Sequence, residues 1–167
     1  VGVLNLSGGT IMEKKEVSGF QTVDAVLDFA IRKEEEASDF YSRWAETVDS
    51  KSISDTLAGF AKEEQKHKTL ILEVKGGKKL DPPRKSITNL KISDYLEESA
   101  PSKDMGFQDA LILAMKREQE SFDLYSSLAS MAEDESIRNL FDSLAREEAK
   151  HKLRLETIYD ESILKEN

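Results

Sequence analysis

Apolar residues recur along four stretches of the chain in alternating steps of four and three, the spacing of one face of an α-helix. Each stretch is long, and none contains a proline. The stretches cover residues 20–49, 52–75, 107–132 and 134–159. The pattern therefore predicts four amphipathic helices and no β-strand.

Each apolar stripe is interrupted near its middle by side chains that a hydrophobic core does not normally accept. A single glutamate interrupts the first and third stripes, whereas in the second and fourth a glutamate is followed three residues later by a histidine. The six interrupting residues are Glu34, Glu64, His67, Glu118, Glu148 and His151. Because residues three apart share one face of a helix, the Glu and His of each pair can reach one common point.

The second half of the sequence repeats the first half without a gap. The only two histidines, His67 and His151, are separated by 84 residues (151 − 67 = 84), and the same shift superposes the glutamates of the other two stripes. Short turns around 49–52 and 133–136 join the helices of each pair, so these neighbours run antiparallel. The chain therefore reads as a duplicated helical hairpin.

A long connection over residues 76–106 separates the two hairpins. Gly76 can stop the second helix, and the Pro82-Pro83 pair prevents its continuation. About 30 residues can run along a bundle and start the second hairpin at the other end, and a short helix at 93–99 is compatible with this segment. We therefore expect an all-α, ferritin-like antiparallel four-helix bundle over residues 20–159, built from two duplicated hairpins with one long crossover.

Composition narrows the possible functions. A chain of 167 residues with 38% apolar residues fits one domain, and a net charge of −9 disfavours nucleic acid and anionic membranes as partners. No apolar run approaches the roughly 20 residues that span a bilayer. We expect residues 1–19 to be disordered or a leader, residues 160–167 to be a C-terminal tail, and the protein to be cytoplasmic.

Four glutamates and two histidines in the core predict a site for two metal ions. Four buried carboxylates carry a charge of −4, which is very unfavourable without cations, and two divalent ions would balance it. The chain has no cysteine, which excludes thiolate zinc sites and iron–sulfur clusters within it. Oxygen ligands with two imidazoles suit iron or manganese, while zinc or cobalt can also bind.

The segments at 30–41 and 60–67, with their second copies, resemble the rubrerythrin family of ferritin-like di-iron proteins, and the resemblance extends over roughly residues 20–159. It implies two iron ions per chain. It also implies individual roles: Glu64 and Glu148 bridge the ions, Glu34 and Glu118 are terminal carboxylates, and His67 and His151 each cap one ion. Tyr41 and Tyr125 match tyrosines that support the ligands in this family, although both also suit an ordinary bundle core.

The sequence departs from rubrerythrins at two points. Those proteins end in a cysteine-ligated rubredoxin domain, which this chain lacks, so electrons would come from a separate donor protein such as a rubredoxin. On the third helix Ser121 stands where rubrerythrins carry an additional glutamate linked to their peroxide chemistry. A homodimer is expected from the family and from the apolar residues Phe40, Phe122 and Leu124 beside the metal stripe.

Five further acidic residues near the motifs fall off the stripes and are expected to be surface charges: Glu35, Glu36, Glu63, Glu120 and Glu147. If the apolar stripe is displaced by one residue from the position assigned to it, Glu36 or Glu120 would belong to the site instead. The main functional hypothesis is a non-haem di-iron oxidoreductase that reduces hydrogen peroxide or dioxygen. The alternatives are iron oxidation with storage, as in bacterioferritin, and a metal-stabilised interaction bundle without turnover; a hydrolytic enzyme is disfavoured because the ligands lie mid-bundle.

Overall fold

Four long α-helices make up almost all of the described chain, and the predicted all-α fold is confirmed. The computed structural model describes residues 23–76 and 105–165. Within these ranges the α-helices are α2 (Val23–Thr47), α3 (Lys51–Gly76), α4 (Phe107–Met131) and α5 (Glu135–Tyr159), with no β-strand. Their bounds lie close to those that the apolar periodicity predicts.

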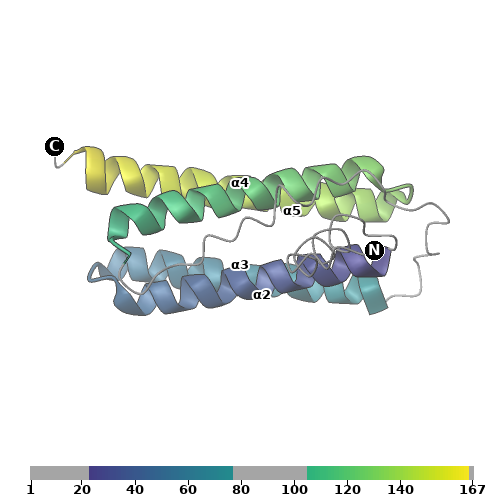
Figure 1. Ribbon diagram of the computed structural model, residues 1–167, viewed down its shortest axis with the longest axis horizontal. Helices are drawn as coiled ribbons and strands as arrows, with labels where there is room; N and C mark the ends of the chain where they lie inside the picture. The colour runs from purple at the N-terminus through teal and green to yellow at the C-terminus, as the bar shows by residue number, and fades with distance from the viewer. Residues whose placement is uncertain (1–22, 77–104, 166–167) are drawn as a thin grey trace, which may run out of the picture.

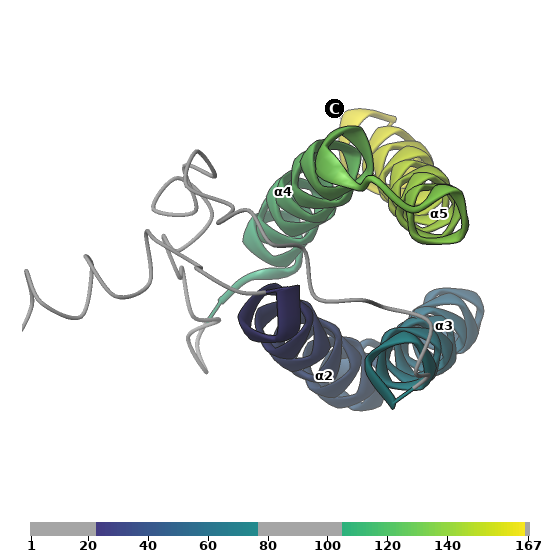
Figure 2. The ribbon, with the colours of Figure 1, turned by 90° about the vertical axis from the view of Figure 1, so that its right-hand side faces the viewer.

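The helices form two antiparallel hairpins that face each other (Figure 1). One hairpin contains α2 and α3, the other contains α4 and α5, and Figure 2 shows α4 beside α2 and α5 beside α3 around a common axis. Helix α3 ends at the opposite end of the bundle from the start of α4, as a single long crossover requires. The leader expected over 1–19 and the short helix expected at 93–99 lie outside the described residues.

The second helix of each hairpin begins at an equivalent place in the repeat. The carboxylate of Asp134 accepts hydrogen bonds from the backbone N–H groups of Ser136 (2.8 Å) and Ile137 (3.2 Å) at the start of α5. At the position 84 residues earlier, Ser50 Oγ accepts from the N–H of Ile53 at 3.4 Å. Such caps satisfy backbone donors that have no partner within the helix. They fix where each Glu-x-x-His motif lies along its helix.

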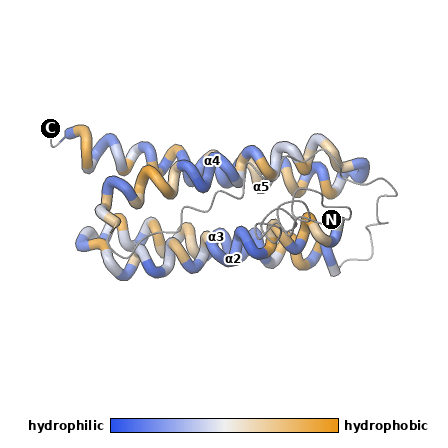
Figure 3. The backbone as a smooth tube through the Cα atoms, in the orientation of Figure 1, coloured by the Kyte–Doolittle hydropathy of each residue, from blue (hydrophilic) through white to orange (hydrophobic). Residues whose placement is uncertain are grey.

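The buried apolar residues form two clusters, one on either side of the middle of the bundle. One cluster includes Leu27, Ile71 and Leu144, and the other includes Leu57, Leu111 and Leu155. Each cluster takes residues from all four helices. Figure 3 shows hydrophobic and hydrophilic positions alternating along each helix. The residues between the two clusters are the polar ones that interrupt the apolar stripes.

Two further observations concern the C-terminal region and the apolar surface. After α5 the chain continues as a π-helical turn, η2 (Asp160–Leu164), within the segment expected to be a tail. Phe40 and Leu124 are buried in the two core clusters, while Phe122 is partly buried against the first cluster. All three therefore pack within the chain itself, and a homodimer stays a prediction that these side chains do not support. In the described part of the chain, no helix has both the length and the apolar character to cross a membrane.

Candidate metal centre

The six residues that interrupt the apolar stripes lie together in the middle of the bundle. Each is at a central position of its helix, and their relative exposures range from 1% for Glu64 and Glu148 to 5% for His67. Apolar clusters lie on either side of them along the bundle. The structure thus brings together every metal ligand that the sequence predicts.

The six side chains divide into two overlapping groups, each with ligand atoms within 4.8 Å of one another. Both groups contain Glu64 and Glu148. Glu34 and His67 complete one group, and Glu118 and His151 complete the other. This arrangement has the form of two metal positions joined by two shared carboxylates, with one further carboxylate and one imidazole at each position.

The Nδ1 atom of His67 faces the carboxylates of three helices. It lies 3.1 Å from Glu148 Oε1, 3.2 Å from Glu64 Oε2 and 3.4 Å from Glu34 Oε2. One small volume therefore has a nitrogen and three carboxylate oxygens around it. Nδ1 is the nitrogen through which this ring would bind a cation.

His151 has the same orientation in the other group. Its Nδ1 atom lies 3.0 Å from Glu64 Oε1, 3.5 Å from Glu118 Oε2 and 3.7 Å from Glu148 Oε2. The two imidazole rings are 6.0 Å apart between centroids, with 21° between their planes. The repeat in the sequence is therefore reproduced as a local twofold relationship within the site.

Several polar atoms of this cluster are buried without a hydrogen bond. Among the described residues they are Glu34 Oε2, Glu64 Oε1, Glu118 Oε2, Glu148 Oε1 and His151 Nδ1. Each of the four oxygens lies within 3.5 Å of a histidine Nδ1 atom, but not in a direction that makes a hydrogen bond. Buried polar atoms are rarely left unsatisfied. Unpaired lone pairs that converge on shared points fit two divalent cations.

The pKa values of Glu34 and Glu118 show that placing four carboxylates close together in the core is electrostatically unfavourable. Burial, reinforced by the negative charge of Glu148, raises the pKa of Glu34 well above its ordinary value. The same two causes raise the pKa of Glu118 to about 8. Without cations, Glu118 therefore favours the protonated form near neutral pH, and the pKa of Glu34 is shifted in the same direction.

The histidines respond in the opposite way. Burial alone would lower the pKa of His67, but its contacts with Glu148, Glu34 and Glu64 outweigh burial and raise it to about 12. The pKa of His151 is also raised, because its carboxylate neighbours outweigh burial. The site thus attracts positive charge: protons supply it in the metal-free protein, and metal ions would replace those protons.

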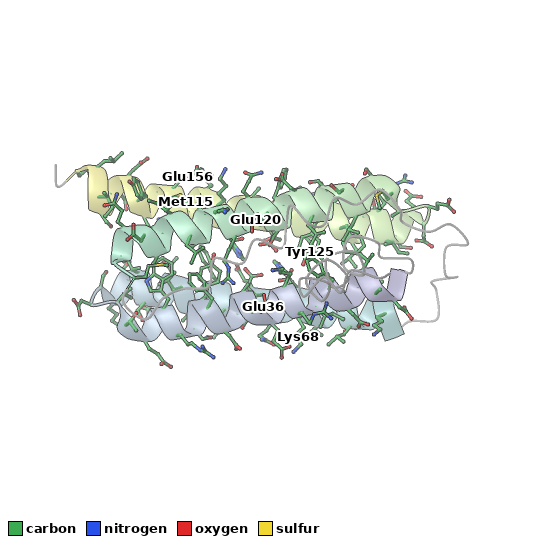
Figure 4. The ribbon with its side chains drawn as sticks, viewed as in Figure 1. Glu36, Lys68, Met115, Glu120, Tyr125 and Glu156 are labelled. Atoms are coloured by element: carbon green, nitrogen blue, oxygen red, sulfur yellow. The ribbon has the colours of Figure 1, made fainter. Side chains whose placement is uncertain are left out.

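Two buried tyrosines connect the hairpins at the site. Tyr41 on α2 donates a hydrogen bond to Glu118 on α4, and Tyr125 on α4 donates to Glu34 on α2. Each tyrosine therefore supports the glutamate of the opposite hairpin, which the stripe pattern did not reveal. Burial, with the charge of Glu118, raises the pKa of Tyr41, so this phenol keeps its proton and remains a donor. Figure 4 shows Tyr125 directed from α4 into the bundle.

Glu63 has a role that the sequence prediction missed. Its carboxylate Oε2 lies 2.5 Å from Nε2 of His151, although its side chain is 45% exposed. The expectation that Glu63 is only a surface charge is therefore wrong. The sequence offers only a partial signal, because a metal-binding histidine usually donates its second N–H to a carboxylate. Glu63 directly precedes the predicted ligand Glu64, but Glu147 precedes Glu148 in the same way.

The other acidic residues outside the stripes stay outside the two groups. Glu35 forms an ion pair with Lys68 at 2.9 Å, and the equivalent contact in the second hairpin is from Lys152 to Gln119 at 2.7 Å. These contacts tie the two helices of each hairpin beside the ligands. Figure 4 labels Glu36 on α2 and Glu120 on α4, and neither belongs to a group of metal-binding side chains within the described residues.

Ser121 follows Glu118 by one turn of α4 and is partly buried. A serine hydroxyl cannot replace a carboxylate as a charged ligand. Within the described residues, the only groups of three or more side chains able to hold a metal are the two above. The two groups therefore comprise four carboxylates and two imidazoles, and Ser121 adds no further carboxylate.

Comparison with known proteins agrees with this architecture. The family model described as Rubrerythrin matches residues 25–159. A structure from Thermotoga maritima, described as a candidate ferritin-like diiron-carboxylate protein, is 22% identical, with a TM-score of 0.71 over 84% of this chain and 96% of its own. A hypothetical protein from Pyrococcus furiosus is 23% identical, with a TM-score of 0.63 over 82% of this chain and 87% of its own. No curated protein matches the sequence significantly.

Proposed function

Since the chain belongs to the rubrerythrin family, we propose that it is a non-haem di-iron oxidoreductase that reduces hydrogen peroxide or dioxygen. The observation that carries this proposal is the pair of overlapping groups that share Glu64 and Glu148. Their oxygen-rich ligand set without sulfur suits iron or manganese, and zinc or cobalt could also occupy it. The description of the Thermotoga maritima structure as a candidate ferritin-like diiron-carboxylate protein supports iron.

The proposed ligands have distinct roles. Glu64 and Glu148 would bridge two ions, while Glu34 with His67 and Glu118 with His151 would complete the two positions. Four carboxylates and two divalent ions sum to zero charge when the imidazoles are neutral. Two bound iron ions would supply the two electrons that reduce one molecule of peroxide to water, changing from the ferrous to the ferric state.

The remaining residues of the site would control geometry and access. Tyr41 and Tyr125 hold the terminal glutamates of the opposite hairpin in place, since both phenols donate to a carboxylate oxygen. The ligands are at most 5% exposed, which restricts the reaction to molecules as small as peroxide or dioxygen. Electrons would come from a donor protein such as a rubredoxin.

The proposal is tested by anaerobic reconstitution with ferrous iron. We expect two iron ions per chain, followed, when hydrogen peroxide is added, by the near-ultraviolet and visible absorption of a ferric pair. Glu64→Ala and Glu148→Ala should each abolish both results. Trace metal only would contradict the proposal. Bound iron that is indifferent to both peroxide and dioxygen would also contradict it, and would favour a metal-stabilised interaction bundle.

One observation favours a second candidate, which is iron oxidation followed by storage. Ser121 stands in place of the additional glutamate of rubrerythrins, and the site of bacterioferritin also uses two Glu-x-x-His motifs. Storage needs a hollow assembly of many subunits. The mass of the protein in solution separates such a cage from the expected homodimer.

A further inference from the structure

The two histidines of the site are held unequally, although the repeat makes them equivalent in sequence. Apart from the carboxylates around its Nδ1 atom, His151 contacts two further residues of α3, Glu63 and Phe60. Glu63 Oε2 lies 2.5 Å from its Nε2 atom, and the ring of Phe60 stacks on its imidazole with centroids 4.3 Å apart and 30° between the planes. His151 is therefore fixed both at its edge and on its face.

His67 lacks both supports. The residue equivalent to Glu63 is Glu147, whose carboxylate accepts a hydrogen bond from Lys150 at 2.8 Å. The residue equivalent to Phe60 is Leu144, which has no ring to stack on an imidazole. Within the described residues, Nε2 of His67 makes no hydrogen bond. The two histidines are therefore held differently for two reasons. Phe60 is replaced by Leu144 in the second copy, and Glu147 pairs with Lys150 whereas Glu63 contacts a histidine.

A histidine that is held in this way binds a metal more strongly for two reasons. The hydrogen bond from its Nε2–H group to a carboxylate leaves the Nδ1 lone pair directed at the metal and makes it more basic. In addition, a ring that is already fixed loses less rotational freedom when the metal binds. Both effects apply to His151, and neither is provided for His67.

We propose that Glu63 is a positioning residue that makes the position formed with Glu118 and His151 the tighter of the two metal positions, so that it fills first. This inference rests on the two-metal site of the proposed function. The fact that Glu63 is partly exposed is useful here, because its replacement leaves the buried core clusters unchanged. Its effect can therefore be measured without loss of the fold.

The test is titration of the metal-free protein with cobalt(II), which reports on coordination by its visible absorption and requires no turnover. Wild-type protein should bind two ions in two resolved steps, and His151→Ala should remove the tighter one. Glu63→Ala should weaken the tighter step by about 10–100-fold, the usual cost of losing such a partner. Glu63→Gln keeps an acceptor oxygen for Nε2–H and should restore most of the affinity.

Glu147→Ala is the matched control, because Glu147 occupies the equivalent place on α5 and its side chain is comparably exposed, at 38%. It should leave both steps unchanged. Two equal steps in wild-type protein, or equal losses in Glu63→Ala and Glu147→Ala, would overturn the inference while the two-metal site stands. No cobalt bound to wild-type protein would overturn the two-metal site itself, and the inference with it.

Discussion

Tyr125 on α4 donates its phenolic hydrogen to Glu34 on α2, a residue 91 positions earlier in the chain and in the other hairpin. Tyr41 makes the reciprocal bond to Glu118. The two hairpins are therefore connected by a pair of crossed hydrogen bonds at the level of the proposed metal ligands. In each bond, both the phenol and the carboxylate are almost completely buried.

Replacement of either tyrosine by phenylalanine should destabilise the protein measurably. Tyr125→Phe leaves a buried carboxylate oxygen of Glu34 without its donor, and such a loss costs about 1–3 kcal/mol. Chemical denaturation of the metal-free protein measures the effect. Tyr159→Phe is the control, because the Tyr159 hydroxyl accepts only an exposed hydrogen bond from Gln108; an equal loss there would contradict the explanation.

Glu118→Gln should separate the folding role of this glutamate from its metal-binding role. The pKa of Glu118 is about 8 in the metal-free protein, so at neutral pH the side chain is largely protonated and a glutamine replaces it with little change in charge. We expect the metal-free variant to be about as stable as wild-type protein at pH 7. Thermal unfolding with added zinc should show a rise in midpoint for wild-type protein and a much smaller rise for the variant. A strongly destabilised metal-free variant would contradict this prediction.

The stability of the metal-free protein should fall as the pH rises above about 6. The folded state raises the pKa of His67 from 6.5 to about 12 and that of Glu118 from 4.5 to about 8. The folded protein therefore binds more protons than the unfolded chain. The contribution of His67 is complete below pH 6.5 and decreases from there towards pH 12, and that of Glu118 decreases between pH 4.5 and pH 8.

Denaturation in the presence of a chelator, from about pH 6 to pH 9, measures this dependence. Saturation with zinc should reduce the slope, because the metal ions replace the protons that the folded state would otherwise bind. Stability that rises with pH in the metal-free protein would contradict the direction of these pKa shifts.

Loss of the Asp134 cap at the start of α5 should lower the free energy of unfolding. Asp134→Ala removes the acceptor for two backbone N–H groups, and loss of an N-cap side chain costs about 1 kcal/mol. Ser50→Ala in the first hairpin should cost less, because the bond it removes is longer, at 3.4 Å. Denaturation curves of the two variants test the order; a larger loss for Ser50→Ala would reverse it.

Much of this architecture follows from the sequence because two independent regularities agree. The apolar period locates the helices, and the constant shift of 84 residues identifies Glu34, Glu64, His67 and their copies as a set. A buried charge needs a counter-charge, so a charged residue at an apolar position of a helix indicates a functional site. Helix positions and the convergence of six side chains could therefore be predicted from one chain.

Contacts between the hairpins could not be predicted in the same way. Stripe patterns place Tyr41 on the same face as Glu34, but they do not determine which of two opposed glutamates the phenol reaches. The contact between Glu63 and His151 depends on how far α3 and α5 are separated and on side-chain rotamers, which the helical period does not contain. It also breaks the repeat, so an argument from equivalence alone would have assigned Glu63 and Glu147 the same role.

The division of the core into two apolar clusters determines how the bundle can come apart. Because each cluster contains residues from all four helices, separating one hairpin from the other would expose both clusters at once. Opening one end of the bundle exposes only one. Local unfolding should therefore proceed from an end towards the middle, and it should stop at the ligand layer when metal ions bind the four helices to one another there.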